Sequence, residues 1–334
     1  MVRKVESAGI IVAAACALLT VVVVLITSLS SSGQAARGSV VLGYVPASLE
    51  YPYNVAVARG FEAEARRLGA RVMLVDPRGS VERQANGIDD LLAQGAQGMA
   101  VLPLDSLIAR PWVDKVTDLG VPFVSVVTQV GDTRTTAWKD VYPKLTALVG
   151  MDNVVAGARA GELAARLLPH DHTAKIAIIE GAAGYPQVAQ RSQGFRNALD
   201  KAGVAFRIVS SQPTDWTAEK GEAVCQNVLT SHPDVDLIFS QADDMALGCA
   251  RALHSSGSDA LLVATGGGSS MGIAAIRAGE LDGSVCDDPT RTGTLAARAL
   301  YEAVVKRGPA KATLIGVDPP AITKANIAAC RTPW

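Results

Sequence analysis

The sequence predicts an α/β protein with two Rossmann-like lobes, each built on a parallel sheet covered by helices, preceded by an N-terminal apolar helix. From residue 38 onward, short runs rich in β-branched residues alternate with segments of helical periodicity. Within residues 81–94, for example, Val81, Ala85, Ile88 and Leu91 fall on one face of a helix. Such alternation is typical of βαβ crossovers, which build parallel sheets with helices on both faces. The expected strands are Val40–Val45, Val72–Val75, Met99–Leu102, Phe123–Val127, Ile176–Ile179, Phe206–Val209, Leu237–Ser240, Leu261–Ala264 and Gly283–Cys286.

We expect two lobes because this number of strands exceeds one flavodoxin-like sheet. The break between them falls in residues 128–148, which are rich in Thr, Asp and Lys and lack clear periodicity. The second unit is expected to begin at Asn153, as the N-cap of a helix over Val154–Leu168. Ligands of such sheets bind at the carboxyl ends of the strands, so the loops that follow the strands are the candidate site.

The first 37 residues have the composition of a membrane anchor or an export signal. Two basic residues at positions 3 and 4 precede an apolar segment, Ala8–Leu29, that is long enough for a helix to cross a bilayer. A cleavable signal usually has a shorter apolar region, but Gly33 and Ala35 have the spacing that a signal peptidase needs. Both alternatives keep the basic end inside and the rest of the chain outside. We therefore expect an extracytoplasmic protein, in the periplasm or on the outer face of the cell membrane, anchored by or exported through residues 8–29.

Charge and cysteine content exclude some partners and cofactors. The 31 Lys and Arg residues balance 32 Asp and Glu residues, so no basic surplus is available for a nucleic acid. Beyond the apolar segment lie Cys225, Cys249, Cys286 and Cys330, which either form disulfides or remain buried thiols. Cys286 with Cys330 is the preferred pair, since both would lie near late crossovers of the chain. No CxxC motif or histidine pair accompanies the cysteines, so no metal ion and no cofactor is expected.

Three predicted loops carry aromatic, amide or cationic side chains. After the first strand, Tyr51, Tyr53 and Asn54 can stack on a ring and bond its hydroxyls, or form a proline-containing turn packed on the lobe. Aromatic residues make up only 4% of the chain, which favours the binding role. Trp216, after a later strand, either covers the apolar face of a sugar or fills a core. Arg191 lies early in a helix, where its charge opposes the dipole, which favours a contact with a ligand or a carboxylate.

Acidic and glycine-rich loops supply further candidates. Of Asp243 and Asp244, one is expected to cap the following helix while the other faces a ligand. Residues 265–270 contain three glycines but match neither a dinucleotide fingerprint nor a phosphate loop, which indicates a flexible cleft loop. Asp287 either accepts hydrogen bonds from ligand hydroxyls or forms the turn before a helix that begins with Pro289.

The sequence shows no catalytic constellation. None of the four histidines is predicted to lie in a strand-end loop beside a nucleophile, and no GxSxG elbow is present. We therefore expect a binding protein and not an enzyme.

Several segments together resemble the periplasmic sugar-binding proteins of the ribose-binding type, which serve ABC importers and share their fold with LacI-type repressors. The resemblance covers roughly residues 40–330, and it implies a type I periplasmic-binding-protein fold with a three-crossing hinge and a ligand cleft between the lobes. The implied lobes are residues 38–150 plus 288–316 and residues 151–287 plus 317–334. The segments that carry the resemblance are Leu229–Val235 leading to Ile238–Gly248, Gly60–Glu62 with Glu64–Ala65, Gly120–Phe123, Asp152–Asn153, Gln190–Phe195 and Ser211–Trp216.

The resemblance also assigns site residues. Tyr51, Tyr53 and Asn54 match the family's ligand-stacking loop, while Arg191 matches its sugar-binding arginine. At the second lobe, Trp216 matches the family's aromatic, and Asp287 falls at a polar hinge ligand. Departures from the family pattern occur at Val127–Thr128, in place of an acidic–basic pair, at Ala242, in place of an asparagine before Asp243, and at Gly267, in place of a strand-end aspartate. At these places Thr128, Asp243 and Gly267 are the expected ligand-binding residues of this chain.

These departures remove hydrogen-bonding groups, each worth about 0.5–1.5 kcal/mol. Ribose or a common hexopyranose in the usual pose is therefore not expected, and a different polyol, a larger glycoside or a cyclitol is favoured. The implied function is capture of a sugar or polyol for an ABC permease with its cytoplasmic ATPase. The alternatives are a membrane-tethered sensor for a signalling partner and a binder of a non-sugar small polar molecule.

Overall fold

The fold is built on two parallel sheets, described here from a computed structural model of residues 39–306, 312–331 and 334. The apolar segment Ala8–Leu29 lies outside these residues, so the prediction of an N-terminal helix or anchor is not tested. Among the described residues, no helix has both the length and the apolar character needed to cross a bilayer.

The first lobe contains a six-stranded parallel sheet in the order β11-β5-β4-β3-β1-β2. Its strands alternate between two cores: Leu42 and Tyr44 pack with α2 and α10, whereas Val45 packs with α3 and α4. This alternation is expected for a sheet covered by helices on both faces. The elements are β1 (Val41–Val45), α2 (Pro52–Arg67), β2 (Arg71–Leu74), α3 (Val81–Ala93), β3 (Gly98–Val101), α4 (Ala109–Asp118), β4 (Phe123–Val126), β5 (Ala147–Gly150), α10 (Pro289–Lys306) and β11 (Thr313–Gly316).

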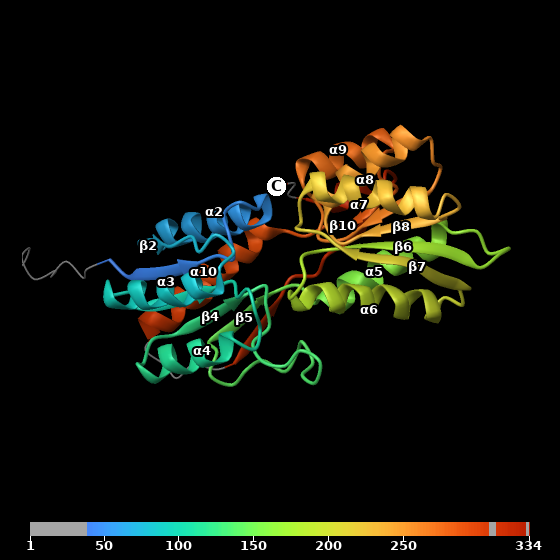
Figure 1. The fold of residues 1–334 in the computed structure, drawn as a ribbon. Coiled ribbons are helices and arrows are strands. Elements are labelled where there is room, and N and C mark those ends of the chain that lie inside the picture. Colours follow the sequence, from blue (N-terminus) through green and yellow to red (C-terminus); the bar gives the residue numbers. More distant parts are fainter. Residues whose placement is uncertain (1–38, 307–311, 332–333) are drawn as a thin grey trace, which may run out of the picture. The chain divides into compact units, whose positions relative to one another are not determined.

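The second lobe contains a four-stranded parallel sheet in the order β7-β6-β8-β9. Helices α7 and α8 cover one face of this sheet and α5 and α6 cover the other (Figure 1). Strand β10 pairs antiparallel with β12, which brings the end of the chain back to this lobe. The elements are α5 (Asn153–Leu167), β6 (Ala174–Glu180), α6 (Pro186–Lys201), β7 (Phe206–Pro213), α7 (Ala218–Ser231), β8 (Leu237–Ser240), α8 (Asp243–Ser256), β9 (Leu261–Ala264), α9 (Ser270–Ala278), β10 (Ser284–Val285), β12 (Ala321–Ile322) and the 3-10 helix η1 (Ile327–Ala329).

The chain passes between the two sheets three times, after β5, between β10 and α10, and after β11. The predicted α/β fold with parallel sheets and three crossings is confirmed. Two local predictions are wrong. The stretch assigned to the break runs into β5, whose four residues are all buried between β4 and β11. The N-cap of α5 is Asp152, which accepts hydrogen bonds from the backbone N–H of Val154 (2.9 Å) and of Val155 (3.3 Å), because the Asn153 side chain is bonded elsewhere.

Close helix contacts fix the orientation of α6. A Cβ at Gly194 of α6 would overlap the carbonyl oxygen of Val154 in α5, and a Cβ at Gly157 would overlap that of Arg191. Only glycine allows the two backbones to approach this closely. The contact brings Asn153 within hydrogen-bonding distance of the Arg191 side chain, since Arg191 Nε lies 2.9 Å from Asn153 Oδ1. The packing of α5 on α6 therefore positions a predicted site residue.

In the first lobe, Glu64 of α2 is a buried carboxylate that joins two helices. It accepts hydrogen bonds from Arg67 of α2 (2.7 and 2.8 Å) and from Arg298 of α10 (2.8 Å). The bonds from Arg67, followed by those from Arg298, lower the pKa of Glu64 to about 2 against the opposing effect of burial. The pair with Arg298 links the last helix of the lobe to its first.

We expect Glu64→Gln to lower the free energy of unfolding at pH 7 by about 1–2 kcal/mol, because a buried acceptor of charged hydrogen bonds is lost. A lowered carboxyl pKa contributes stability above the ordinary value of 4.5, and this contribution disappears as the pH falls toward 2. Urea unfolding of the two proteins should therefore converge below pH 4.5. Glu62→Gln, on the same helix but in an exposed pair with Arg66, is the matched control and should change stability by less than about 0.5 kcal/mol.

Candidate functional site

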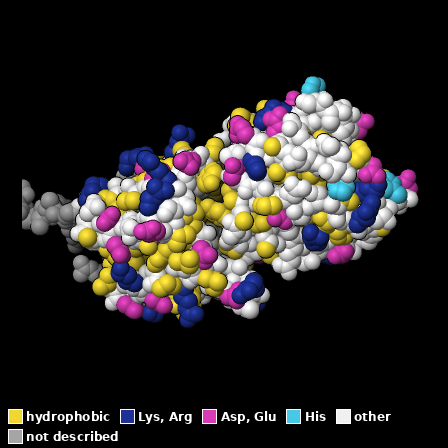
Figure 2. All heavy atoms as spheres, in the orientation of Figure 1, with side chains coloured by type: hydrophobic (Ala, Val, Ile, Leu, Met, Phe, Trp, Pro, Cys, Tyr) yellow, Lys and Arg dark blue, Asp and Glu magenta, His cyan; other side chains and the backbone are white. Residues whose placement is uncertain are grey.

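A cavity of about 690 Å³, part of it open to solvent, lies where strand-end loops of the two lobes meet. Its wall combines five aromatic rings with one cationic, one acidic and two amide side chains, which is the composition of a site for a small ligand with polar groups and apolar faces. On the face of the molecule seen in Figure 2, acidic and basic side chains are interspersed. The lining residues are Ala47, Tyr51, Tyr53, Asn54, Leu102, Val127, Tyr185, Gln187, Arg191, Trp216, Ala242, Asp244, Gly266 and Trp334.

The first-lobe wall is formed by the loop between β1 and the start of α2. Pro52 begins this helix, and its fixed φ suits the first helical position. Asn54 is oriented by a hydrogen bond from its Nδ2 to the carbonyl of Ser48 (2.8 Å). The Tyr53 hydroxyl donates to Oδ2 of Asp287 (2.8 Å), so this wall is tied to the crossing between β10 and α10. The predicted cluster of Tyr51, Tyr53 and Asn54 does line the cavity.

Arg191 is 6% exposed and faces the cavity from α6. Its Nε donates to Asn153 Oδ1 (2.9 Å) and its Nη1 donates to the carbonyl of Gln241 (2.5 Å). Burial lowers the pKa of the guanidinium, and the negative charge of Asp287 partly offsets that effect. Gly266, at φ +62°, leaves room for the guanidinium, because a Cβ there would lie 2.8 Å from Nη1. Arg191 thus lines the cavity and lies within the electrostatic influence of Asp287, and its contact with a ligand stays a prediction.

Asp287 is buried at the crossing and lies behind Tyr53, outside the residues that line the cavity. Burial raises the pKa of Asp287, while the hydrogen bond from Tyr53 and the charge of Arg191 lower it. Burial of the Tyr53 hydroxyl, followed by the negative charge of Asp287 and the hydrogen bond to it, raises the pKa of Tyr53. The carboxylate therefore orients the Tyr53 ring through a hydrogen bond and balances the buried charge of Arg191, and it does not line the cavity itself.

Trp216 forms the second-lobe aromatic wall. Its backbone has φ +70°, and its ring covers Gly181 so closely that a Cβ on that glycine would overlap the indole. The ring meets Tyr185 edge to face, with centroids 5.8 Å apart, and the Arg191 guanidinium carbon lies 6.0 Å from the ring centroid. The indole therefore lines the cavity with Gly181 packed against its ring and the Arg191 guanidinium nearby.

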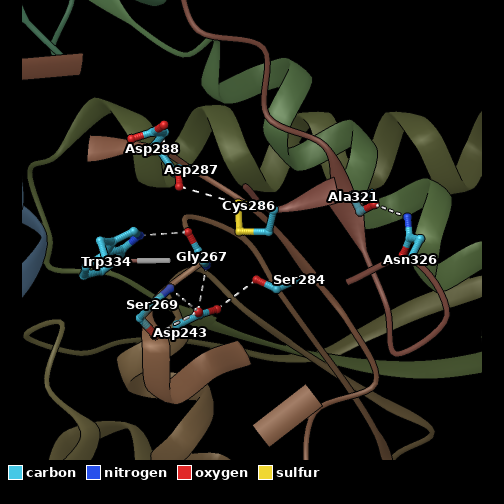
Figure 3. The surroundings of a disulfide bond; sticks show 12 residues. Asp243, Gly267, Ser269, Ser284, Cys286, Asp287, Asp288, Ala321, Asn326 and Trp334 are labelled. Atoms are coloured by element: carbon cyan, nitrogen blue, oxygen red, sulfur yellow. Dashed lines mark hydrogen bonds between the residues drawn. A yellow bond between two sulfur atoms is a disulfide. The ribbon is translucent and has the colours of Figure 1, made fainter. Parts of the chain in front are cut away.

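Besides Asp287, three further predicted site residues lie outside the cavity lining. Asp243, 1% exposed, accepts hydrogen bonds from Gly268 N (3.0 Å), Ser269 N and Oγ (3.2 and 3.1 Å) and Ser284 Oγ (2.8 Å), so it organises the loop after β9 (Figure 3). Its neighbour Asp244 lines the cavity. Neither aspartate supplies an N-cap, because Ala242 holds that position without a side-chain bond.

For the other two predicted residues, too, the residue that lines the cavity is the immediate neighbour in the sequence. Gly267 contributes its backbone to the interior of the lobe, where its N–H donates to the carbonyl of Val285 (2.9 Å), and Gly266 lines the cavity instead. Thr128 is 1% exposed and its hydroxyl has no partner among the described residues, whereas Val127, at φ +64°, lines the cavity.

Three aromatic or polar residues of the cavity were not predicted from the sequence: Tyr185, Gln187 and Trp334. Tyr185 precedes Pro186 at the start of α6, as Tyr51 precedes Pro52 at the start of α2, and both tyrosines occupy N-cap positions. This repeated Tyr-Pro pair was a signal available in the sequence. Trp334 had no such signal, since it follows the last strand and reaches the cavity only through tertiary packing.

The described residues contain two disulfides, Cys286–Cys330 and Cys225–Cys249. The first is the pair preferred from the sequence and lies beside the crossing between β10 and α10. The second joins α7 to α8. Among the described residues, no group of three or more His, Cys, Asp or Glu side chains has an arrangement that could hold a metal ion.

Residues 42–308 match the family model of the periplasmic binding protein domain, which covers most of the chain. The chain belongs to this family. It is 30% identical over 270 residues to the ribose import binding protein of Bacillus subtilis, a match that covers 81% of this chain and 83% of that protein. The predicted resemblance is confirmed.

Among the solved structures of similar periplasmic binding proteins, two hold a small polyol or cyclitol. An ABC transporter solute binding protein from Mycobacterium smegmatis with bound glycerol is 26% identical, with a TM-score of 0.78 over 87% of this chain and 96% of that one. The Caulobacter myo-inositol binding protein bound to myo-inositol is 27% identical, with a TM-score of 0.78 over 89% of this chain and 98% of that one.

Within this periplasmic binding domain, Asp244 is the acidic group of the cavity, and burial, followed by the charges of Asp243 and Glu219, raises its pKa to about 6. If the ionised form accepts ligand hydroxyls, lowering the pH from 7.5 to 5 should weaken binding up to about tenfold, as Asp244 becomes protonated. Calorimetric titrations across this range, with whichever sugar or cyclitol binds, measure the effect.

A raised carboxyl pKa favours the protonated folded state, so Asp244→Asn should also stabilise the ligand-free protein at pH 7, by about 1 kcal/mol. A pH profile that is the same in Asp244→Asn as in the native protein would remove Asp244 from this role.

Proposed function

We propose that the protein is the extracytoplasmic solute-binding component of an ABC importer and that it captures a sugar or polyol between its lobes. The observation that carries this proposal is the composition of the cavity, where aromatic rings from both lobes surround Asn54, Arg191 and Asp244. Such a wall offers stacking surfaces for ring C–H groups and a few hydrogen-bonding groups that fix orientation. Closure of the two lobes over the ligand would present a surface for the permease, which works with a cytoplasmic ATPase.

The ligand class follows from what lines the cavity and from what similar proteins bind. The named relatives and structures include a ribose import protein and proteins with bound glycerol or myo-inositol. In this chain Val127, Ala242 and Gly266 line the cavity at or beside the positions where the sequence departs from the sugar-binding pattern. These side chains offer no hydrogen-bonding groups, so we favour a polyol or cyclitol that is held by stacking and fewer polar contacts over ribose in the family's usual pose.

The proposal includes an extracytoplasmic location, with Ala8–Leu29 as an uncleaved anchor or an export signal, and no bond-breaking chemistry. An anchor would keep the binding protein close to its permease in the membrane. Labelling of intact cells with a membrane-impermeant reagent tests the location, and the mass of the mature protein distinguishes the anchor from the cleaved signal.

The ligand proposal is tested by a thermal-shift screen of residues 38–334 against sugars, polyols, cyclitols and amino acids. A ligand at 100 times its dissociation constant should add about 2.7 kcal/mol to the free energy of unfolding. For a protein of this size, that gain raises the melting temperature by several degrees. A shift with amino acids alone, or with none of the sugars, polyols and cyclitols, would contradict the proposed ligand class.

A further inference from the structure

Trp334 is held at the cavity by both its backbone and its indole. Its N–H donates to the carbonyl of Gly268 (3.2 Å), and its carbonyl accepts from the N–H (2.8 Å) and the hydroxyl (3.1 Å) of Ser270. The indole Nε1 donates to the carbonyl of Gly267 (3.2 Å), as Figure 3 shows. These partners are Gly267 and Gly268, in the loop between β9 and α9, and Ser270, the first residue of α9, so this loop and the start of α9 determine where the ring points.

The Cys286–Cys330 disulfide lies directly against the same loop. Gly268 has φ +92°, and a Cβ there would lie 2.9 Å from Sγ of Cys286 and 3.0 Å from Sγ of Cys330. Both cysteines are buried, at 5% and 6% exposure. Cys330 ends the short η1 helix, four residues before Trp334. The disulfide therefore holds Cys330, four residues before Trp334 in the sequence, beside the loop to which the Trp334 indole is bonded.

A third contact connects this assembly to the first lobe. The Trp334 ring meets Tyr53 edge to face, with centroids 5.7 Å apart and planes at 86°. The same Tyr53 donates its hydroxyl to Asp287, the residue that follows Cys286. Tyr53 of the first lobe therefore contacts both Trp334 and Asp287, the latter at the crossing next to the disulfide.

The cavity uses aromatic residues out of proportion to their number. The chain has 4 Trp, 6 Tyr and 5 Phe residues. Five of these aromatic residues line the cavity: Tyr51, Tyr53, Tyr185, Trp216 and Trp334. Trp334 and Trp216 both belong to the second lobe, and each has a tyrosine at its edge, Tyr53 and Tyr185 respectively. Two indoles of this kind suit a ligand with a rigid ring and apolar faces better than an open chain, whose ordering costs more conformational entropy.

We propose that Trp334 is a ligand-contacting residue that selects ring-shaped polyols, and that the Cys286–Cys330 disulfide is the clip that holds it in the cavity. This inference rests on the proposed function, because it concerns the same cavity. It adds a residue outside the resemblance to the family, and it gives the disulfide a role in binding as well as in stability.

The test is calorimetric titration of the full chain in mild detergent with myo-inositol, D-ribose, D-allose and the open-chain polyol ribitol. We expect Trp334→Ala to weaken the best-binding ring ligand about tenfold, and to change ribitol binding less than about twofold. Trp334→Phe should keep most of the affinity for the ring ligand. Equal affinity of Trp334→Ala and the native protein for that ligand, or an equal loss for ribitol, would overturn the selective role.

The clip is tested with Cys286→Ala/Cys330→Ala, which should reproduce the loss seen for Trp334→Ala. The matched control is Cys225→Ala/Cys249→Ala, which removes the other disulfide, outside the cavity lining, and should leave affinity within about twofold. Circular dichroism verifies folding at the titration temperature, and if the first double variant does not fold, the two Trp334 variants carry the test of the binding role.

A measurement without ligand tests the role of the Cys286–Cys330 disulfide independently of the proposed function. The emission of Trp334, taken as the difference between each protein and its Trp334→Phe counterpart, should shift to the red and be quenched by acrylamide about twofold more strongly when Cys286 and Cys330 are alanine. The control pair should show no change. Unchanged quenching in Cys286→Ala/Cys330→Ala overturns the clip. If none of the four probes binds the native protein, the ligand-contacting role fails together with the proposed function, while the quenching result still decides the clip.

Discussion

Replacing Arg191 with alanine is expected to weaken ligand binding at least about a hundredfold and to lower the free energy of unfolding by about 2–3 kcal/mol. The side chain is 6% exposed and bonded to Asn153 Oδ1 and to the carbonyl of Gln241. Its removal leaves two buried acceptors without a donor and takes the compensating positive charge away from buried Asp287. A ligand would lose the cationic group of the cavity as well.

Isothermal titration with the ligand found in the screen gives the change in affinity, and urea unfolding gives the change in stability. Arg191→Lys retains the charge but not the fork of donors, so it should recover part of the stability and little of the affinity. Arg196→Ala, on the same helix but outside the cavity lining, is the matched control and should change neither quantity appreciably. If Arg191→Ala binds within threefold of the native protein, Arg191 is structural and the cavity is not organised around it.

The sequence predicted the order of strands and helices well, and with it the general position of the cavity. Residues that follow parallel strands must meet at one edge of a sheet, so the sequence alone assigns Tyr51, Tyr53 and Asn54 to a common site. Arg191 was a candidate because a cation early in a helix is unfavourable unless something compensates it. The structure supplies that compensation through Asp287.

The sequence could not decide which of two adjacent residues faces the cavity. Val127 and Gly266 line it where Thr128 and Gly267 were predicted, and both lining residues have positive φ, +64° and +62°. A left-handed residue reverses the direction of the side chains around it, and neither periodicity nor composition reveals where this occurs at a strand end. Asp244 replaces Asp243 for a different reason, because the loop after β9 requires a buried acceptor for the N–H groups of residues 268 and 269.

Strand β5 and Trp334 were missed because long-range packing determines both. Residues 147–150 form a strand between β4 and β11, and β11 comes from a part of the chain more than 160 residues later. Trp334 meets Tyr53, which lies almost at the other end of the described sequence. Short apolar runs and single aromatic residues carry too little local signal to reveal such partners.

Trp216→Ala is expected to weaken ligand binding about thirtyfold, corresponding to about 2 kcal/mol, with a smaller effect on stability. The indole covers Gly181, contacts Tyr185 at its edge and lies beside the Arg191 guanidinium. Removing it exposes the backbone of Gly181 and leaves a gap in the cavity wall where a sugar or cyclitol would rest its apolar face. The residue that replaces it must still adopt φ +70°, a strain that alanine tolerates no better than tryptophan, so the backbone contributes little to the difference.

Titration of Trp216→Ala and Trp216→Tyr with the same ligand separates ring stacking from loop structure. Tyrosine retains an aromatic face and should recover much of the affinity, whereas a loop that has merely lost its shape would not be restored by a smaller ring. Trp112→Ala removes a half-buried tryptophan from α4 in the first lobe, outside the cavity lining, and should change stability but leave affinity within about twofold. Equal losses of affinity in Trp112→Ala and Trp216→Ala would mean that general destabilisation, and not the cavity wall, accounts for the effect.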